Sequence, residues 1–170
     1  MKKISPVLLV FVALMSCQEK TVGSDEVTPV NWNKRSANLT TSDSLQKGVT
    51  YLSVYSQIYS RSEHRRHDLT ATVSLRNVSI EDTIYVSRAQ FFGTEGKLIR
   101  TYFDQPIFIL PLETVEIVIQ EVDNEGGTGG NFIFEWMINP GTPEPLFEAV
   151  MISTSGQQGI SFTTRGIQIR

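Results

Sequence analysis

Residues 69–77 read Leu-Thr-Ala-Thr-Val-Ser-Leu-Arg-Asn, and this stretch carries the pattern that decides the fold. Apolar side chains at positions 69, 71, 73 and 75 alternate with polar side chains at 70, 72, 74 and 76. Successive side chains of a β-strand point to opposite faces of the sheet, so a period of two indicates a strand with one buried face. The stretch therefore predicts a strand in a sheet that is covered on one side.

The same alternation recurs along the chain, and Gly- and Pro-containing turns separate the runs. No segment shows a sustained period of 3.6 residues, so parallel β/α folds, which need helices, are excluded. We predict an all-β fold, an antiparallel immunoglobulin-like β-sandwich, with a jelly roll or a small barrel as the alternative. The further predicted strands are 51–60, 83–92, 98–103, 114–121, 131–138, 147–154 and 159–165.

The only cysteine, Cys17, follows a basic and then an apolar stretch. The apolar run 4–14 is shorter than the ~20 residues that span a bilayer, and its length is typical of a signal peptide. Leu14-Met15-Ser16-Cys17 resembles a bacterial lipobox, which implies cleavage after Ser16 and acylation of Cys17. The alternative is ordinary cleavage that leaves Cys17 as an unpaired thiol.

Lipidation would decide where the protein resides. Two or three acyl chains, at about 0.8 kcal/mol per buried CH₂, give stable anchoring to membrane lipid. We therefore expect a lipid-anchored protein of the bacterial cell envelope. Gln18, rather than aspartate, follows Cys17, which favours the outer membrane under enterobacterial sorting; the side of that membrane stays open.

Composition restricts the function further. One cysteine allows neither an internal disulfide nor a thiolate metal cluster, and we predict no cofactor and no metal site. Loss of residues 1–16 removes Lys2 and Lys3 and changes the formal net charge from −3 to −5, so nucleic acid is not an expected partner. We divide the chain into a signal peptide (1–16), a lipidated cysteine with a flexible tether (17–47) and a β-sandwich domain (48–170).

Several segments together resemble a family of small bacterial proteins known as domain of unknown function 3124. The resemblance spans roughly residues 48–168, and the segments occur in the same order. It implies an exported, often lipid-anchored β domain and implies no activity. The segments are 51–59 (YLSVYSQIY), 69–77, 96–100, 127–137 (GTGGNFIFEWM), 148–152 (EAVMI) and 156–166 (GQQGISFTTRG).

Two groups of residues are candidates for ligand binding. Tyr51, Tyr55 and Tyr59 would share one face of the predicted strand 51–60, and tyrosines among small polar residues are typical of recognition surfaces. The alternative is that these rings pack under the tether or a loop. The second group is a C-terminal hairpin, in which two glutamines and an arginine offer contacts to a sugar or a peptide backbone, or cap carbonyls of the loop itself. These residues are Gln157, Gln158 and Arg165.

Glu135 and Glu148 each interrupt an otherwise apolar strand. If those strands are neighbours, the carboxylates form the kind of pair that glycosidases use, which gives an alternative function, an envelope hydrolase. The structural alternative is that each carboxylate pairs with an arginine on a sheet face, because an unpaired buried charge is costly. We predict no catalytic residue, and expect a binding or accessory module for an envelope protein or glycan rather than an enzyme.

Two further stretches carry weaker signals. Residues 61–67 are the only concentrated basic patch and suit a solvated loop, a contact with anionic lipid or glycan, or a metal site at His64 and His67. The glycine run 126–130 suits a flexible hairpin, or an anion cradle formed by its backbone amides.

Overall fold

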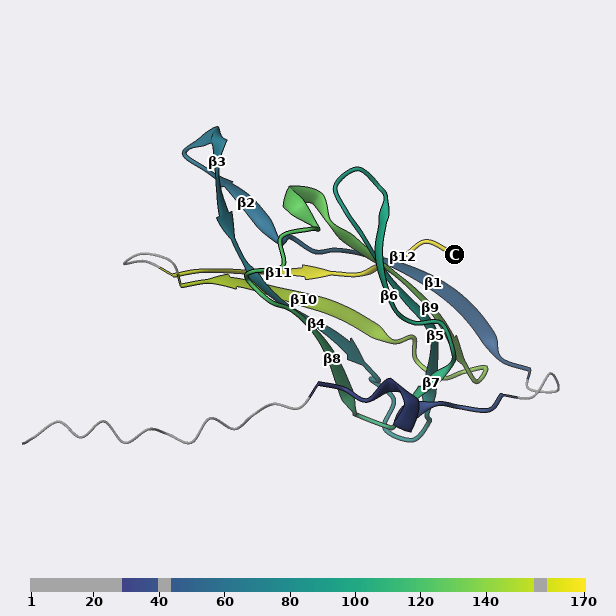
Figure 1. Cartoon of the computed structure of the whole chain (residues 1–170). Coiled ribbons are helices and arrows are strands. Elements are labelled where there is room, and N and C mark those ends of the chain that lie inside the picture. The colour runs from purple at the N-terminus through teal and green to yellow at the C-terminus, as the bar shows by residue number, and fades with distance from the viewer. Residues whose placement is uncertain (1–28, 40–43, 155–158) are drawn as a thin grey trace, which may run out of the picture.

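A computed structural model describes residues 29–39, 44–154 and 159–170 of the chain. Its strands form two antiparallel sheets that pack face to face, and a separate two-stranded hairpin projects from one end (Figure 1). Within the described residues, no helix is both long enough and apolar enough to span a membrane. The predicted all-β sandwich is confirmed.

The larger sheet has the strand order β12-β1-β9-β5-β6, with β7 paired to β5. The smaller sheet has the order β11-β10-β4-β8, and β2 pairs with β3 in the hairpin. The strands are β1 (Gln46–Ser53), β2 (Gln57–Ser60), β3 (Ser62–Asp68), β4 (Thr70–Arg76), β5 (Ile84–Phe92), β6 (Leu98–Phe103), β7 (Ile107–Ile109), β8 (Thr114–Ile119), β9 (Asn131–Ile138), β10 (Leu146–Ser153), β11 (Ile160–Arg165) and β12 (Ile167–Gln168).

The stretch that decides the fold forms β4, an interior strand between β10 and β8. Ala71, Val73 and Leu75 are fully buried between the sheets, as the period-two pattern predicts. Thr70 and Thr72 lie on the outer face and remain partly exposed. One buried face and one outer face is the usual condition of an antiparallel strand in a sandwich.

A row of aromatic rings crosses the core and joins the two sheets. Phe91 of β5 stacks on Phe132 of β9 at 4.9 Å, and Phe132 lies 5.3 Å from Phe134 on the same strand. Phe134 then stacks on Phe147 of β10, in the other sheet, with ring centroids 4.4 Å apart. Each such pair adds about 0.5–1.5 kcal/mol to the stabilisation from burial, and the pair of Phe134 and Phe147 is the one that joins the two layers.

The two open sheets exclude the barrel alternative, because neither sheet closes on itself. The pairing of β4 with β8 and of β5 with β9 is the B–E and C–F pairing of immunoglobulin sandwiches. The outer strands are distributed differently. In an immunoglobulin domain the first strand joins the sheet of B and E, whereas here β1 pairs with β9, and β10 pairs with β4.

The run 51–60, predicted as one strand, is divided in the structure. Strand β1 ends at Ser53 and β2 begins at Gln57. Between them the Val54 amide donates to the carbonyl of Gly130 at 2.9 Å, and the Ser56 amide donates to that of Gly127 at 3.1 Å. The chain therefore turns around the glycine segment, and β2 leaves the sheet.

Strands β3, β7 and β12 were not predicted, and each lacks the expected pattern. Strand β3 is exposed at every position except the partly buried His67, so it shows no apolar alternation. Strands β7 and β12 have three and two residues, too few to show a period. The basic stretch 61–67 is consequently a strand of the projecting hairpin rather than a loop.

Residues 29–39, within the expected tether, pack against the domain at the end opposite the hairpin (Figure 1). Trp32 begins a short 3₁₀ turn, η2 (Trp32–Arg35), and its ring lies 4.8 Å from that of Phe103. The Ala37 amide donates to the carbonyl of Pro106 at 2.8 Å. Arg35 pairs with Glu113 at 2.6 Å. Aromatic, backbone and ion-pair contacts therefore fix this segment to the sandwich.

The contact between Arg35 and Glu113 depends on pH. The pKa of the Glu113 carboxyl lies below its usual value of 4.5, chiefly because Arg35 donates a hydrogen bond to it. A carboxyl whose pKa is lowered in the folded state contributes its full stabilisation at pH values above its usual pKa. That stabilisation is lost as the pH falls through the lowered pKa. We expect the segment to be released in acid, seen as a shift of the Trp32 indole NMR signal toward its exposed position as the pH falls below 4.5.

Two variants test this expectation. Glu113→Gln should weaken the contact with Arg35 at neutral pH and abolish the acid-induced shift of the Trp32 signal. Glu116→Gln, on the outer face of β8, is the control and should show the same shift as the wild type. An unchanged acid transition in the Glu113→Gln variant would show that another group releases the segment.

Candidate functional site

A cleft of about 570 Å³ opens at the end of the sandwich that carries the projecting hairpin. Three segments meet there: the hairpin β2–β3, the turn 93–97 between β5 and β6, and the loop 124–128 that precedes β9. Figure 1 shows these segments together at the top of the view. The side chains that matter below are Gln57, Tyr59, Arg66, Lys97, Asn124 and Thr128.

The glycine loop on one side of the cleft is ordered by close contacts, not a flexible hairpin. A Cβ atom on Gly126 would lie 2.4 Å from Cζ of Phe91, so the backbone rests directly on this core ring. Gly127 has φ of +65°, a left-handed conformation that favours glycine. The Thr94 hydroxyl donates to the Gly126 carbonyl at 3.0 Å and accepts from the Gly129 amide at 2.9 Å. Residues 127–129 form the short 3₁₀ turn η3 (Gly127–Gly129).

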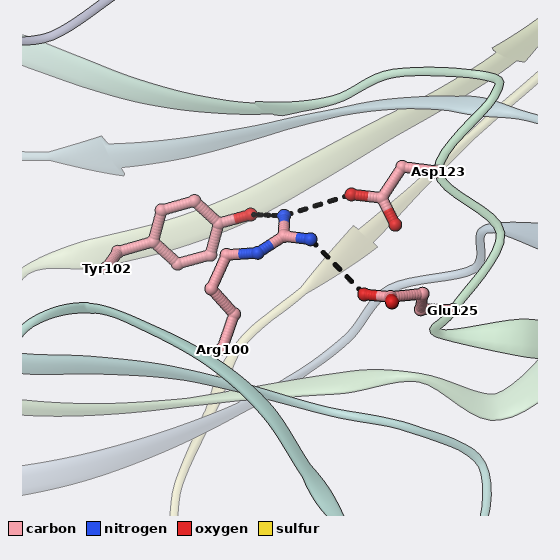
Figure 2. A network of polar contacts seen from close by, with 4 residues as sticks. All are labelled: Arg100, Tyr102, Asp123 and Glu125. Carbon is pink, nitrogen blue, oxygen red and sulfur yellow. Dashed lines mark hydrogen bonds and ion pairs between the residues drawn. The ribbon is translucent and has the colours of Figure 1, made fainter.

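Arg100 fastens the same loop to strand β6. Figure 2 shows its guanidinium between the phenol of Tyr102 and the carboxylates of Asp123 and Glu125. Its Nη1 donates to Oδ2 of Asp123 at 2.9 Å and to the Tyr102 hydroxyl at 3.2 Å, while Nη2 donates to Oε2 of Glu125 at 3.3 Å. The hydrogen bond to Asp123 raises the pKa of Arg100, and burial raises the pKa of Tyr102. The arginine therefore stays charged and the phenol stays protonated.

The hairpin presents an aromatic ring and a cation on the opposite side of the cleft. Tyr59 and Arg66 are direct partners across β2 and β3, and the guanidinium carbon lies 5.6 Å from the ring centroid. Arg66 Nη1 donates to Oε1 of Gln57 at 3.2 Å, and Gln57 donates to Asp68 at 2.7 Å. Because Tyr59 remains 54% exposed, its ring is available to a ligand.

The three tyrosines predicted as one face lie on three different segments. Tyr51, in β1, lies on the outer face of the larger sheet between Ile133 and Ile167. Tyr55 follows the end of β1 and packs edge-on against Phe162 at 5.8 Å. Only Tyr59 reaches the cleft. The face is divided because β1 ends before the chain enters the hairpin.

Of the other predicted ligand-binding positions, the structure describes only Arg165, and it does not line this cleft. Arg165 lies in β11, exposed and directly opposite Glu148. Gln157, Gln158 and the lipidation candidate Cys17 lie outside the described residues.

Glu135 and Glu148 do not form the pair that a hydrolase needs. Glu135 belongs to β9 in the larger sheet and Glu148 to β10 in the smaller one. Buried residues flank each of them along its strand, so both carboxylates point outward, on opposite faces of the sandwich. Arg88 pairs with Glu135 and Arg76 with Glu148, each at 3.4 Å. The whole core separates two carboxylates that a glycosidase holds within about 10 Å.

The two histidines of the hairpin are also separate. His64 lies 3.4 Å from Glu63 on the exposed strand, and His67 pairs in register with Ile58. Among the residues that the structure describes, no three His, Cys, Asp or Glu side chains gather in a way that could hold a metal ion.

Sequence reasoning located the basic stretch and the glycine run but did not bring them together. The two stretches form different sides of the cleft and lie about sixty positions apart in the chain. Arg100, Asp123 and Glu125 gave no signal at all, because single charged residues near turns are ordinary. The glycine run carried the usable hint, since consecutive glycines mark positions of close backbone approach.

The Arg100 network should control the stability of the loop. Arg100→Met keeps the apolar stem of the side chain and removes the guanidinium. We expect amide hydrogen exchange at Ser56, Gly127 and Gly129 to become about fivefold faster. This corresponds to a loss of about 1 kcal/mol in the free energy of local opening, a modest value because the ion pairs are partly exposed. Lys97→Met, which breaks only an exposed pair with Glu95, is the control. Unchanged exchange in Arg100→Met would show that contact with Phe91 alone orders the loop.

Comparison with known proteins gives a family but no activity. The crystal structure of Thermotoga maritima 1070 is similar, with a TM-score of 0.45 and 11% sequence identity, over 71% of this chain and 92% of that one. No curated protein matches the chain. The family model described as "Protein of unknown function (DUF3124)" matches residues 47–169, and the chain belongs to this family.

Proposed function

We propose that the protein is a lipid-anchored binding module of the bacterial cell envelope, attached to the outer membrane through acylated Cys17. Its partner, an envelope protein or glycan, binds in the cleft between the hairpin β2–β3 and the loop 124–128. The anchor rests on the lipobox resemblance, and the binding role rests on the cleft.

The observation that carries the binding role is the construction of the cleft. Its volume of about 570 Å³ falls within the range of ligand sites. Its walls are loops and a hairpin on a rigid sandwich, the usual location of recognition residues. An exposed aromatic ring, Tyr59, lies there with a guanidinium and an amide, and the Arg100 network fixes the facing loop. Preorganised side chains of this kind lower the cost of ordering on binding.

The position of the N-terminal segment is consistent with this role. Strand β6 runs from Leu98, beside the cleft, to Phe103, where Trp32 packs. Six residues of strand span roughly 20 Å, so the segment leading toward the anchor and the cleft lie at opposite ends of the domain. An anchored domain of this shape directs its cleft away from the membrane.

The anchor is tested by growing cells with an alkyne-bearing fatty acid and detecting the label on the protein. We expect wild-type protein to carry the label and to sediment with membranes, whereas Cys17→Ser should lose the label and leave the membrane fraction. An unlabelled wild-type protein would disprove the lipid anchor.

The binding role is tested by crosslinking in cells with the full chain. A photoreactive amino acid at position 128, in the cleft, should give an adduct with an envelope component. The same residue at position 72, on the outer face of the smaller sheet, is the control and should give none. Adducts from position 72 and none from position 128 would place the contact elsewhere and contradict the proposed function.

A further inference from the structure

We propose that the cleft binds a sugar ring that carries an anionic group, such as a uronic acid or a sugar phosphate within an acidic glycan. This inference rests on the proposed function and names the ligand class of the same site. Arg66 provides the charge contact and Tyr59 the stacking surface.

The charged side chains of the cleft differ in how they are paired. Glu95 is paired with Lys97 at 2.8 Å, and Glu125 is paired with Arg100 at 3.3 Å. Both carboxylates that line the cleft thus already have a basic partner in the protein. Within the described part of the chain, Arg66 makes no ion pair with a carboxylate, and its guanidinium donates one hydrogen bond, to the neutral amide of Gln57. Arg66 is therefore the cation of the cleft that no carboxylate pairs with directly.

The neighbouring acid on the hairpin is also engaged. Asp68, on the same face of β3 as Arg66, accepts a hydrogen bond from Gln57 at 2.7 Å. Gln57 thus lies between Asp68 and Arg66. Its amide nitrogen donates to Asp68, and its amide oxygen accepts from Arg66 and holds the guanidinium in place. Arg66 uses only Nη1 for this contact, so its other guanidinium N–H groups remain available. A guanidinium binds carboxylate or phosphate oxygens in a bidentate manner.

The other groups in the cleft suit a sugar. The exposed Tyr59 ring offers a flat apolar surface, with Arg66 beside it. Asn124 and Thr128 line the cleft, and within the described residues their side chains have no hydrogen-bond partner. An amide and a hydroxyl without partners can donate to and accept from the hydroxyl groups of a sugar.

An acidic peptide fits the cleft less well. Extended peptides are commonly held by an unpaired strand edge, which supplies main-chain hydrogen bonds. Here two of the three walls are turns, residues 93–97 and 124–128, and the loop 124–128 directs its backbone groups to Thr94 and Ser56. The recognition groups are side chains around an aromatic ring, so the glycan is the better match.

The hairpin contains its own matched control. Arg65 and Arg66 are adjacent on the exposed strand β3, and successive residues of a strand point to opposite faces. Arg66 lies in the cleft, whereas Arg65 is not among the residues that line it. Replacing either one by glutamine changes the net charge equally, so only a specific contact distinguishes them.

The test is titration calorimetry with the full-length protein in mild detergent at about 0.15 M salt, where long-range attraction is screened. The probes are tetrasaccharides of galacturonic, glucuronic and mannuronic acid, mannose 6-phosphate, and the neutral galactose and mannose tetrasaccharides. We expect acidic probes to bind more tightly than neutral ones. Arg66→Gln and Tyr59→Ala should each weaken binding about tenfold or more, and Arg65→Gln by less than about threefold.

The outcomes separate this inference from the proposed function. Tighter binding of the uronates or of the phosphate identifies the source of the anionic group. Equal losses in Arg65→Gln and Arg66→Gln, or no preference for acidic over neutral probes, would overturn the inference. If either result occurs while position 128 still crosslinks in cells, the binding module stands and only its ligand class is wrong. Circular dichroism melts of the variants should match the wild type, because the substituted side chains are exposed.

Discussion

The stacking of Phe134 on Phe147 is the contact on which the rest of the structure depends. It joins the larger sheet to the smaller one at 4.4 Å, and the row of rings continues through Phe132 to Phe91. The backbone of Gly126 rests on the ring of Phe91. The same core that holds the sheets together therefore also supports the loop that forms one side of the cleft.

A second connection runs from the core to the cleft through charged groups. Tyr102 packs 5.6 Å from Phe132 and accepts a hydrogen bond from Arg100, which binds the carboxylates of Asp123 and Glu125. The loop is thus held by contact with the ring of Phe91 and by the ion pairs of Arg100. Glu125, one of the two carboxylates that line the cleft, is thereby paired with Arg100 rather than with Arg66.

The strands could be predicted from the sequence wherever one face of the sheet is buried. The stretch 69–77 contains β4, and 131–138 coincides with β9, because alternation reports burial directly. Strand β3 could not be predicted in this way, because burial does not alternate along it and every residue except the partly buried His67 is exposed. The alternation also could not show that Glu135 and Glu148 occupy different sheets, since strand order depends on packing across the core. The cleft was missed for the same reason: its walls meet only in the folded chain.

The cleft at the loop end of the sandwich is the proposed ligand site. The most direct measurement is a ¹H–¹⁵N NMR titration of the full-length protein with the galacturonic acid tetrasaccharide. We expect the changes in chemical shift to concentrate at the cleft residues Gln57, Tyr59, Arg66, Asn124 and Thr128. Changes centred instead on the outer face of the larger sheet, around Tyr51 and Tyr85, would contradict it.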